Sequence, residues 1–415
     1  MVSLALMTLG GVGMYSVTVV LPRIQSEFAV ARGDASLPYT MTMIGFGIGG
    51  IVMGKLSDRF GVMVPVLIGT VGLGAGFVAA GYAGNLWMFS LIQGFVIGLL
   101  GTSATFSPLV ADTSLWFTRK RGIALAICMS GNYLAGAVWP PVIQHFVESV
   151  GWRQTYVGSG VFCLLSMLPL ALFLRRRPPA PVSAPLPAQL PAQRPASLPA
   201  AAAQATASTR SMVSDRPLGM SPATLQILLC IAGLSCCVAM SMPQVHIVAY
   251  CGDLGFGAAR GAEMLALMLG MGVASRLLSG WISDHIGGLR TLLLGSVLQG
   301  IALLMFLPFD GLVPLYLISA MFGLFQGGIV PSYALIVREY FTPQEAGTRV
   351  GTVLMATLFG MALGGWMSGV IFDWTGSYKA AFVNGIAFNA LNLSIVLYLL
   401  YRARQLARPV VLPAV

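Results

Sequence analysis

GKLSDRFG at residues 54–61 returns as GWISDHIG at residues 280–287, an offset of 226 residues. A second pair of loops repeats in the same way, because WFT at 116–118 returns as YFT at 340–342, an offset of 224 residues. Chance rarely places two pairs of loops in register to within two residues. We therefore predict that the chain is a duplicated unit, an arrangement known from helical membrane proteins with internal repeats.

Apolar stretches surround these loops, six in each half, and each is long enough to cross a bilayer as a helix. Hydrophobic residues make up 57% of the chain and charged residues only 9%, against about 25% charged in soluble domains. This composition predicts an all-α membrane protein whose 12 transmembrane helices form two pseudo-symmetric six-helix bundles. The apolar stretches are 2–21, 37–54, 63–82, 86–108, 122–147, 154–174, 224–250, 261–283, 291–309, 312–337, 348–372 and 379–401.

The segment 175–221 divides the two bundles. It is rich in Ala and Pro and has no apolar periodicity, which predicts a disordered or extended linker. The expected organisation is a first bundle at 1–174, this linker, a second bundle at 222–403 and a tail at 404–415. Residues 1–21 have no charged leading region and no small-residue cleavage site, so we interpret them as the first membrane helix rather than a signal peptide.

Basic residues predict the orientation. The loops after the odd-numbered helices hold five Lys and Arg, whereas the opposite side holds 17 of the 23. The positive-inside rule then places both termini and the linker in the cytoplasm of a cell whose inner membrane the chain spans. The formal charge of +10 is therefore a signal of topology, and no aromatic-interleaved basic face indicates nucleic-acid binding.

Arg276 lies inside the apolar stretch 261–283. An arginine at this depth costs at least about 2.5–3.5 kcal/mol, and it cannot lose its proton as a buried lysine could. The sequence offers no acid as a fixed partner inside the membrane, so we expect a mobile anion to be the partner. The alternative is a structural arginine that bonds backbone carbonyls or reaches the interface with its charged end.

The motifs above resemble a known family. GKLSDRFG fits G-x-L-x-D-R-x-G, the loop signature of the major facilitator superfamily, and the resemblance covers the chain outside the linker. A narrower set is similar to the monocarboxylate porters and their bacterial oxalate/formate antiporter relatives. This set is WFTRKRGIA at 116–124, SG at 130–131, GWR at 151–153 and SRLLSG at 275–280. In those families an arginine of the eighth helix binds the substrate carboxylate, and the resemblance implies this role for Arg276.

The chain also departs from these families. The animal porters carry an acid four residues before the arginine, where this chain has Gly272. The oxalate exchanger has a lysine on its eleventh helix, whereas the stretch 348–372 has no basic residue after Arg349. Val62 and Met63 replace the basic residues that normally follow the loop signature. A single buried positive charge suits a substrate with one carboxylate, since a second would stay unpaired at low dielectric.

Other polar residues in the apolar stretches are candidates for the site. We expect Tyr133, Tyr333, Asn132 and Gln244 to contact substrate, although each could instead bond a neighbouring helix. His246 is the candidate for proton coupling because histidine titrates in the useful range. The alternative for His246 is a hydrogen-bonded structural residue.

The repeated loops are candidates for gating. Asp58 can cap or pair at helix ends and Arg59 can latch the two bundles in one state, whereas the alternative is that Gly54 and Gly61 only make tight turns. The predicted gating residues are Gly54, Asp58, Arg59, Gly61, Gly280, Asp284 and Gly287.

These features predict a secondary carrier of small monocarboxylates of the lactate and pyruvate type. It would work as a monomer by alternating access and couple to protons or a counter-anion. Nothing indicates catalysis, a metal or a cofactor, since no phosphate-binding loop and no Cys–His ligand spacing occurs. The alternatives are an efflux carrier for another metabolite or drug, and a membrane sensor that transports nothing.

Overall fold

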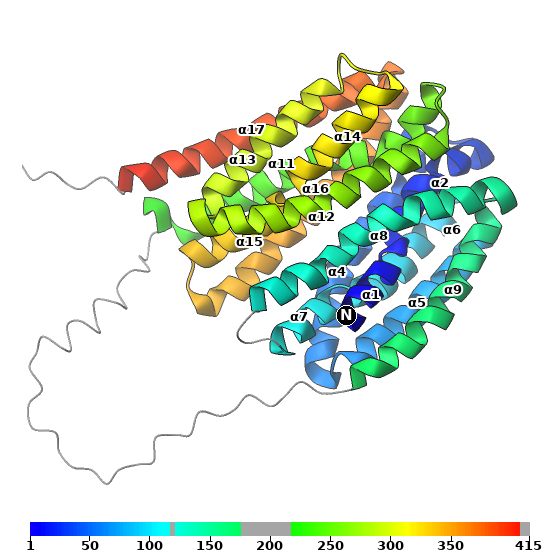
Figure 1. Cartoon of the computed structure of the whole chain (residues 1–415), viewed down its shortest axis with the longest axis horizontal. Coiled ribbons are helices and arrows are strands. Elements are labelled where there is room, and N and C mark those ends of the chain that lie inside the picture. The colour runs from blue at the N-terminus through cyan, green and yellow to red at the C-terminus, as the bar shows by residue number, and fades with distance from the viewer. Residues whose placement is uncertain (117–120, 176–216, 407–415) are drawn as a thin grey trace, which may run out of the picture.

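The structure, a computed structural model, describes residues 1–116, 121–175 and 217–406. Helices form the whole of the ordered architecture in these ranges, and twelve helical spans are long and apolar enough to cross a membrane. The spans of the first half lie together as one bundle and those of the second half as another (Figure 1). The predicted all-α fold of twelve spans is thus confirmed. The predicted linker and tail fall largely outside the described residues.

The first bundle contains α1 (Val2–Gly10), α2 (Val12–Phe28), α3 (Arg32–Ala35), α4 (Leu37–Phe60), α5 (Met63–Gly81), α6 (Leu86–Leu91), the π-helix η1 (Ile92–Thr102), α7 (Ser107–Trp116), α8 (Arg121–Val150), α9 (Trp152–Leu172) and η2 (Phe173–Arg175). The second contains η3 (Pro217–Gly219), α11 (Pro222–Asp253), α12 (Ala258–Ile286), α13 (Gly288–Met305), α14 (Leu312–Gln326), α15 (Ile329–Tyr340), α16 (Pro343–Thr375) and α17 (Tyr378–Leu406).

Most helices are longer than the apolar stretches that predicted them. The first span continues to Phe28 and the fourth to Trp116, beyond the predicted ends at 21 and 108. Apolar composition marks only the part of a helix that lies in the hydrocarbon. The helix itself continues into the polar interface until its backbone is capped, which the apolar pattern does not report.

The two repeated loops have the same backbone geometry. Gly61 has φ 85° and ψ 164°, and Gly287 has φ 81° and ψ 164°. Each glycine N–H donates to the serine carbonyl four residues earlier, at 2.8 Å for Ser57 and 2.9 Å for Ser283. A positive φ of this kind strains any residue with a Cβ, so the loops need glycine at both positions. This geometry supports the predicted duplication.

We name the two ends of the molecule by the predicted orientation. The inner end carries the turns at Gly61 and Gly287, and the outer end carries α3 and the turn at Gly151. The two bundles meet along four helix pairs, α4 with α16, α8 with α12, α3 with α16 and α2 with α11. A site between the bundles therefore draws residues from both halves.

Glycine allows the second and fourth spans of each bundle to touch. A Cβ on Gly45 of α4 would lie 2.0 Å from the Gly94 carbonyl oxygen of η1. In the second bundle a Cβ on Gly323 of α14 would lie 1.9 Å from the Met268 carbonyl oxygen of α12. Small residues permit such approaches between membrane helices, and the same close pair recurs in both halves.

We expect Gly45→Ala to destabilise the first bundle. Its added methyl meets backbone rather than a movable side chain, and overpacking of this kind costs about 1–3 kcal/mol. The matched control is Gly54→Ala on the same helix, because a Cβ at Gly54 meets nothing within 4 Å. The measurement is thermal unfolding in detergent. Equal melting temperatures for the two variants would contradict the predicted contact.

Candidate functional site

Arg276 of α12 lies at the interface between the two bundles. Its side chain is half-buried, and Nη1 donates to the Met129 carbonyl oxygen of α8 at 3.1 Å. One of its nitrogens therefore makes the bond to a backbone carbonyl that we expected of a structural arginine. The Nε atom is buried and has no acceptor among the described residues. No carboxylate in the same ranges pairs with Arg276.

The free edge of this guanidinium suits a carboxylate. Nη1 is occupied by Met129 and Nε has no acceptor among the described residues, so the side formed by Nε and Nη2 has no carboxylate partner there. Two parallel N–H groups on one side of a guanidinium match the two oxygens of a carboxylate. Arginine thus has one anchored nitrogen that fixes its position and one open edge that is able to bind an anion.

Tyr133 of α8 lies directly against Arg276. The Arg276 Cζ atom is 4.6 Å from the centroid of the Tyr133 ring, a cation–π distance. Gly272 makes this contact possible, because a Cβ at that position would lie 2.5 Å from Cδ1 and Cε1 of the same ring. The predicted neighbours Arg276 and Tyr133 are therefore brought together. An aromatic ring occupies the space next to the position where the animal porters carry an acid.

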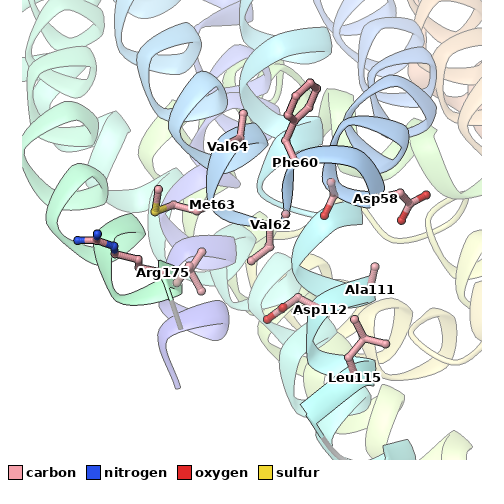
Figure 2. Close-up of a pocket in the computed structure, with 12 residues that line it drawn as sticks. Asp58, Phe60, Val62, Met63, Val64, Ala111, Asp112, Leu115 and Arg175 are labelled. Atoms are coloured by element: carbon pink, nitrogen blue, oxygen red, sulfur yellow. The ribbon is translucent and has the colours of Figure 1, made fainter. Parts of the chain in front are cut away.

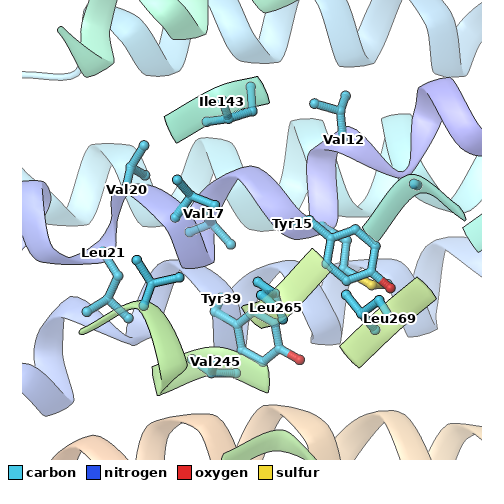
Figure 3. Close-up of a cluster of buried hydrophobic side chains, with 14 of the residues drawn as sticks. Val12, Tyr15, Val17, Val20, Leu21, Tyr39, Ile143, Val245, Leu265 and Leu269 are labelled. Atoms are coloured by element: carbon cyan, nitrogen blue, oxygen red, sulfur yellow. The ribbon is translucent and has the colours of Figure 1, made fainter. Parts of the chain in front are cut away.

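Two further tyrosines belong to the same region and were missed from the sequence. Tyr15 of α2 packs over Gly136, with its Cζ atom 2.8 Å from where a Cβ would lie, and Tyr39 of α4 packs over Gly365 at 2.9 Å. Both residues are buried in the interface between the bundles (Figure 3). Tyr15 is close enough to Tyr133 and Arg276 to interact with both electrostatically.

The hydroxyls of Tyr15 and Tyr39 receive no hydrogen bond from a protein group within the described ranges, whereas the Tyr133 hydroxyl is close enough to Arg276 to interact with its guanidinium. The three side chains are at most 7% exposed. Buried phenols require partners, and water or a bound substrate in this interface would supply them. The signal in the sequence was available, since each is a lone phenol in or beside an apolar stretch.

Two predicted contacts form bonds within the second bundle instead. The Tyr333 hydroxyl donates to Oδ1 of Asn392 at 2.8 Å, and the tyrosine is fully buried. Gln244 donates through Nε2 to Oε1 of Gln326 at 2.9 Å. These geometries support the alternative of a bond to a neighbouring helix. A direct role for Tyr333 or Gln244 in substrate binding stays a prediction.

Asn132 is half-buried on α8 next to Tyr133. Its Oδ1 atom lies 3.7 Å from the position of a Cβ on Gly11, the residue that joins α1 to α2. Asn132 therefore faces the junction between α1 and α2 in the first membrane span. Its contact with substrate stays a prediction.

His246 is fully buried on α11, and both of its ring nitrogens have partners. Nε2 lies 2.8 Å from the Gly365 carbonyl oxygen and Nδ1 lies 3.1 Å from the Tyr378 hydroxyl. A carbonyl only accepts, so Nε2 carries the hydrogen and Nδ1 accepts from Tyr378. This arrangement connects His246 to the outer end of α17 and shows no position free for a substrate.

The predicted gating residues fall into three groups. Gly61 and Gly287 make the turns described above, whereas Gly54 and Gly280 face open space. Asp58, Arg59 and Asp284 are exposed and form no ion pair within the described residues. The tight-turn alternative thus has structural support for Gly61, and a latch at Arg59 stays a prediction.

The loop at 54–61 borders a cavity at the inner end of the first bundle. The cavity measures about 490 Å³, and its lining includes Asp58, Asp112 and Arg175 (Figure 2). Asp112 accepts a hydrogen bond from Nε1 of Trp116 at 3.1 Å. The cavity lies within one bundle, so it is separate from the interface that holds Arg276.

The sequence matches a known protein family along both bundles. The family model described as Major Facilitator Superfamily matches residues 2–315 and 264–412. Monocarboxylate transporter 13 of Rattus norvegicus is 26% identical over 364 residues, which cover 85% of this chain and 76% of that protein. The uncharacterised MFS-type transporter YcxA of Bacillus subtilis is 26% identical over 381 residues, covering 89% and 86%.

A solved structure has the same fold. The crystal structure of the peptide transporter POT in complex with sulfate superimposes with a TM-score of 0.73 at 13% identity, covering 98% of this chain and 94% of that one. The family match spans both bundles and agrees with the twelve spans and the repeated loops. The chain therefore belongs to the major facilitator superfamily of transporters.

Proposed function

We propose that the chain carries small monocarboxylates of the lactate and pyruvate type across the cell membrane. Both termini would lie in the cytoplasm, and the two bundles would rock about a site at Arg276. The observation that carries the proposal is the open Nε edge of Arg276, buried between the bundles without a carboxylate partner in the described residues. The name of the transporter from Rattus norvegicus supports the same class of cargo.

The charge of the site favours one carboxylate over two. A carboxylate about 4 Å from the guanidinium gains on the order of 4 kcal/mol at an effective dielectric near 20, before desolvation. Tyr15, Tyr39 and Tyr133 add hydroxyls but no second cation. A second carboxylate would therefore lose its hydration without gaining a partner.

The same charge favours exchange of anions as the mode of coupling. With the site empty, the bundles would have to close around an unneutralised guanidinium, which is costly at low dielectric. With a monocarboxylate bound, the pair is neutral and closure is easier. We therefore propose that the loaded carrier reorients faster than the empty one, so that one anion is exchanged for another.

Counterflow in liposomes tests the proposal. Uptake of radiolabelled lactate into vesicles preloaded with unlabelled lactate should exceed uptake into empty vesicles by about tenfold or more, which corresponds to about 1.4 kcal/mol between the two reorientation barriers. A pH gradient across empty vesicles should not substitute for the internal anion.

The outcomes separate the alternatives. Equal uptake into preloaded and empty vesicles would contradict exchange but leave monocarboxylate transport in place. Strong stimulation by the pH gradient alone would indicate proton coupling. If no carboxylate in a panel of acids gives saturable uptake, the cargo is of another class or the chain is a sensor.

A further inference from the structure

Arg32 at the outer end joins the two bundles. It is only 7% exposed and begins the short helix α3 of the first bundle. Its guanidinium donates to both oxygens of Asp253 at 3.1 and 3.2 Å and to the Tyr378 hydroxyl at 2.7 Å. The backbone N–H groups of Arg32 and Gly33 donate to the two oxygens of Asp373 at 2.8 and 2.7 Å.

These five hydrogen bonds join three helices of the second bundle to two adjacent residues of the first, Arg32 and Gly33. Asp253 ends α11, Asp373 lies near the end of α16, and Tyr378 begins α17. The Arg32 guanidinium also lies 4.7 Å from the ring centroid of Phe372, a cation–π distance. These bonds hold the two bundles together at the outer end.

His246 contacts this cluster through the Tyr378 hydroxyl. The Tyr378 hydroxyl accepts from Arg32 and donates to Nδ1 of His246, while Nε2–H of His246 donates to the Gly365 carbonyl. A chain of hydrogen bonds thus runs from Arg32 through Tyr378 and His246 to α16. This cluster is distinct from the carboxylate site proposed at Arg276.

We propose that Arg32 is the latch of an outer gate, and that His246, acting through Tyr378, makes this latch open more readily in acid. The proposal rests on the chain being an alternating-access transporter and is independent of the cargo. His246 is a positioning residue here, because it acts on Arg32 through Tyr378.

The reason is that protonation changes Nδ1 of His246 from a hydrogen-bond acceptor to a donor. A proton on Nδ1 removes the lone pair that the Tyr378 hydroxyl uses, so this hydroxyl loses its acceptor. The proton also places a second positive charge near Arg32, since both groups bond the same phenolic oxygen. Protonation of His246 therefore disfavours the closed gate, whereas an open gate would expose the ring to water.

The other charged and titratable groups around the His246 ring do not reverse the direction of this pH effect. Asp253 gives both oxygens to the Arg32 guanidinium, and Asp373 gives both oxygens to backbone N–H groups. Neither carboxylate bonds His246. Tyr250, on the same helix as His246, packs edge-on against Tyr378 and contributes no charge.

Distances between spin labels at the outer end test the proposal without any substrate. Tyr82 follows the outer end of α5, and Phe309 lies in the outer loop between α13 and α14, one in each bundle; they are 73% and 47% exposed. In the chain labelled at Tyr82→Cys and Phe309→Cys, the population with a long label distance should rise about fivefold or more between about pH 8 and pH 5.

Three variants assign the change to the proposed groups. Arg32→Ala should show the long distance at both pH values, and Asp253→Asn is the milder second variant if Arg32→Ala does not fold. His246→Gln should stay closed in acid, because a glutamine amide donates to Gly365 and accepts from Tyr378 without titrating. The control is Lys379→Ala, which removes an exposed outer ion pair to Asp310 within the second bundle and should behave as the parent chain.

Two results would overturn the proposal. One is an unchanged distance distribution in both folded Arg32→Ala and folded Asp253→Asn. The other is a pH response in His246→Gln as large as that of the parent chain. The spin-label distances are measured without a carboxylate substrate. Failure of the gate and failure of the proposed transport can therefore be told apart.

Discussion

Arg276→Ala is expected to lose carboxylate uptake by about a hundredfold or more. The variant removes the cation whose free edge faces the interface. The pair it forms with a carboxylate is worth on the order of 4 kcal/mol before desolvation, and half of that value already corresponds to more than a tenfold change in affinity. The measurement is counterflow of radiolabelled lactate in liposomes that contain equal amounts of folded protein.

Two further variants test the role of Arg276. Arg276→Lys tests the geometry of the guanidinium, and Arg260→Ala is the control. Lysine keeps the charge but has no planar pair of N–H groups, so we expect weak uptake with reduced preference for carboxylates over halides. Arg260 lies on the same helix as Arg276, but it is exposed and pairs with Glu263 at 3.0 Å. Arg260→Ala should therefore transport as the parent chain does. Unchanged uptake in Arg276→Ala would remove this arginine from the site.

Gly272→Asp is expected to abolish uptake at neutral pH and to regain part of it in acid. The new carboxylate would stand four residues before Arg276, where the two side chains are neighbours on one helix face. It would then compete with the substrate for the guanidinium until it becomes protonated. Uptake measured from about pH 7 down to pH 4, near the ordinary pKa of aspartate, follows this recovery.

Gly272→Asn is the matched control for the charge. Both side chains displace the Tyr133 ring, because any Cβ at this position lies 2.5 Å from it. The cost of moving the ring is therefore shared by the two variants, and only the aspartate adds a negative charge. We expect Asn to exceed Asp at neutral pH and the two to converge in acid. Equal activity at every pH would show that a fixed acid beside Arg276 does not block the site.

Much of the fold was readable from the sequence because it depends on local and repeated features. Apolar length gives the twelve spans, and glycine at 61 and 287 marks two turns that need positive φ. The ends of the helices were less readable, since capping and continuation into the interface leave no apolar signal.

The site was readable in part. Arg276 was evident from the cost of a lone cation in an apolar stretch. Its neighbour Tyr133 was a candidate, but the contact depends on Gly272 leaving room for the ring. Tyr15 and Tyr39 stand out in the sequence as lone phenols within apolar stretches, but their position next to the interface follows from packing across helices and was missed.

The outer cluster was hidden by sequence distance. Arg32 served only as one of the basic residues that set the orientation, because its partners lie 221 residues away at Asp253 and 341 residues away at Asp373. His246 was a candidate for proton coupling, with a hydrogen-bonded structural residue as the alternative. The occupation of both its nitrogens, which favours a supporting role over substrate contact, required the positions of Tyr378 and Gly365.

Equilibrium binding to the purified chain tests the central claim most directly. Radiolabelled lactate bound to the parent protein should be displaced by unlabelled lactate but not by lactamide, its neutral amide, and Arg276→Ala should bind no measurable label. Displacement by lactamide as effective as that by lactate, or undiminished binding in folded Arg276→Ala, would contradict the assignment of Arg276 as the anion-binding residue.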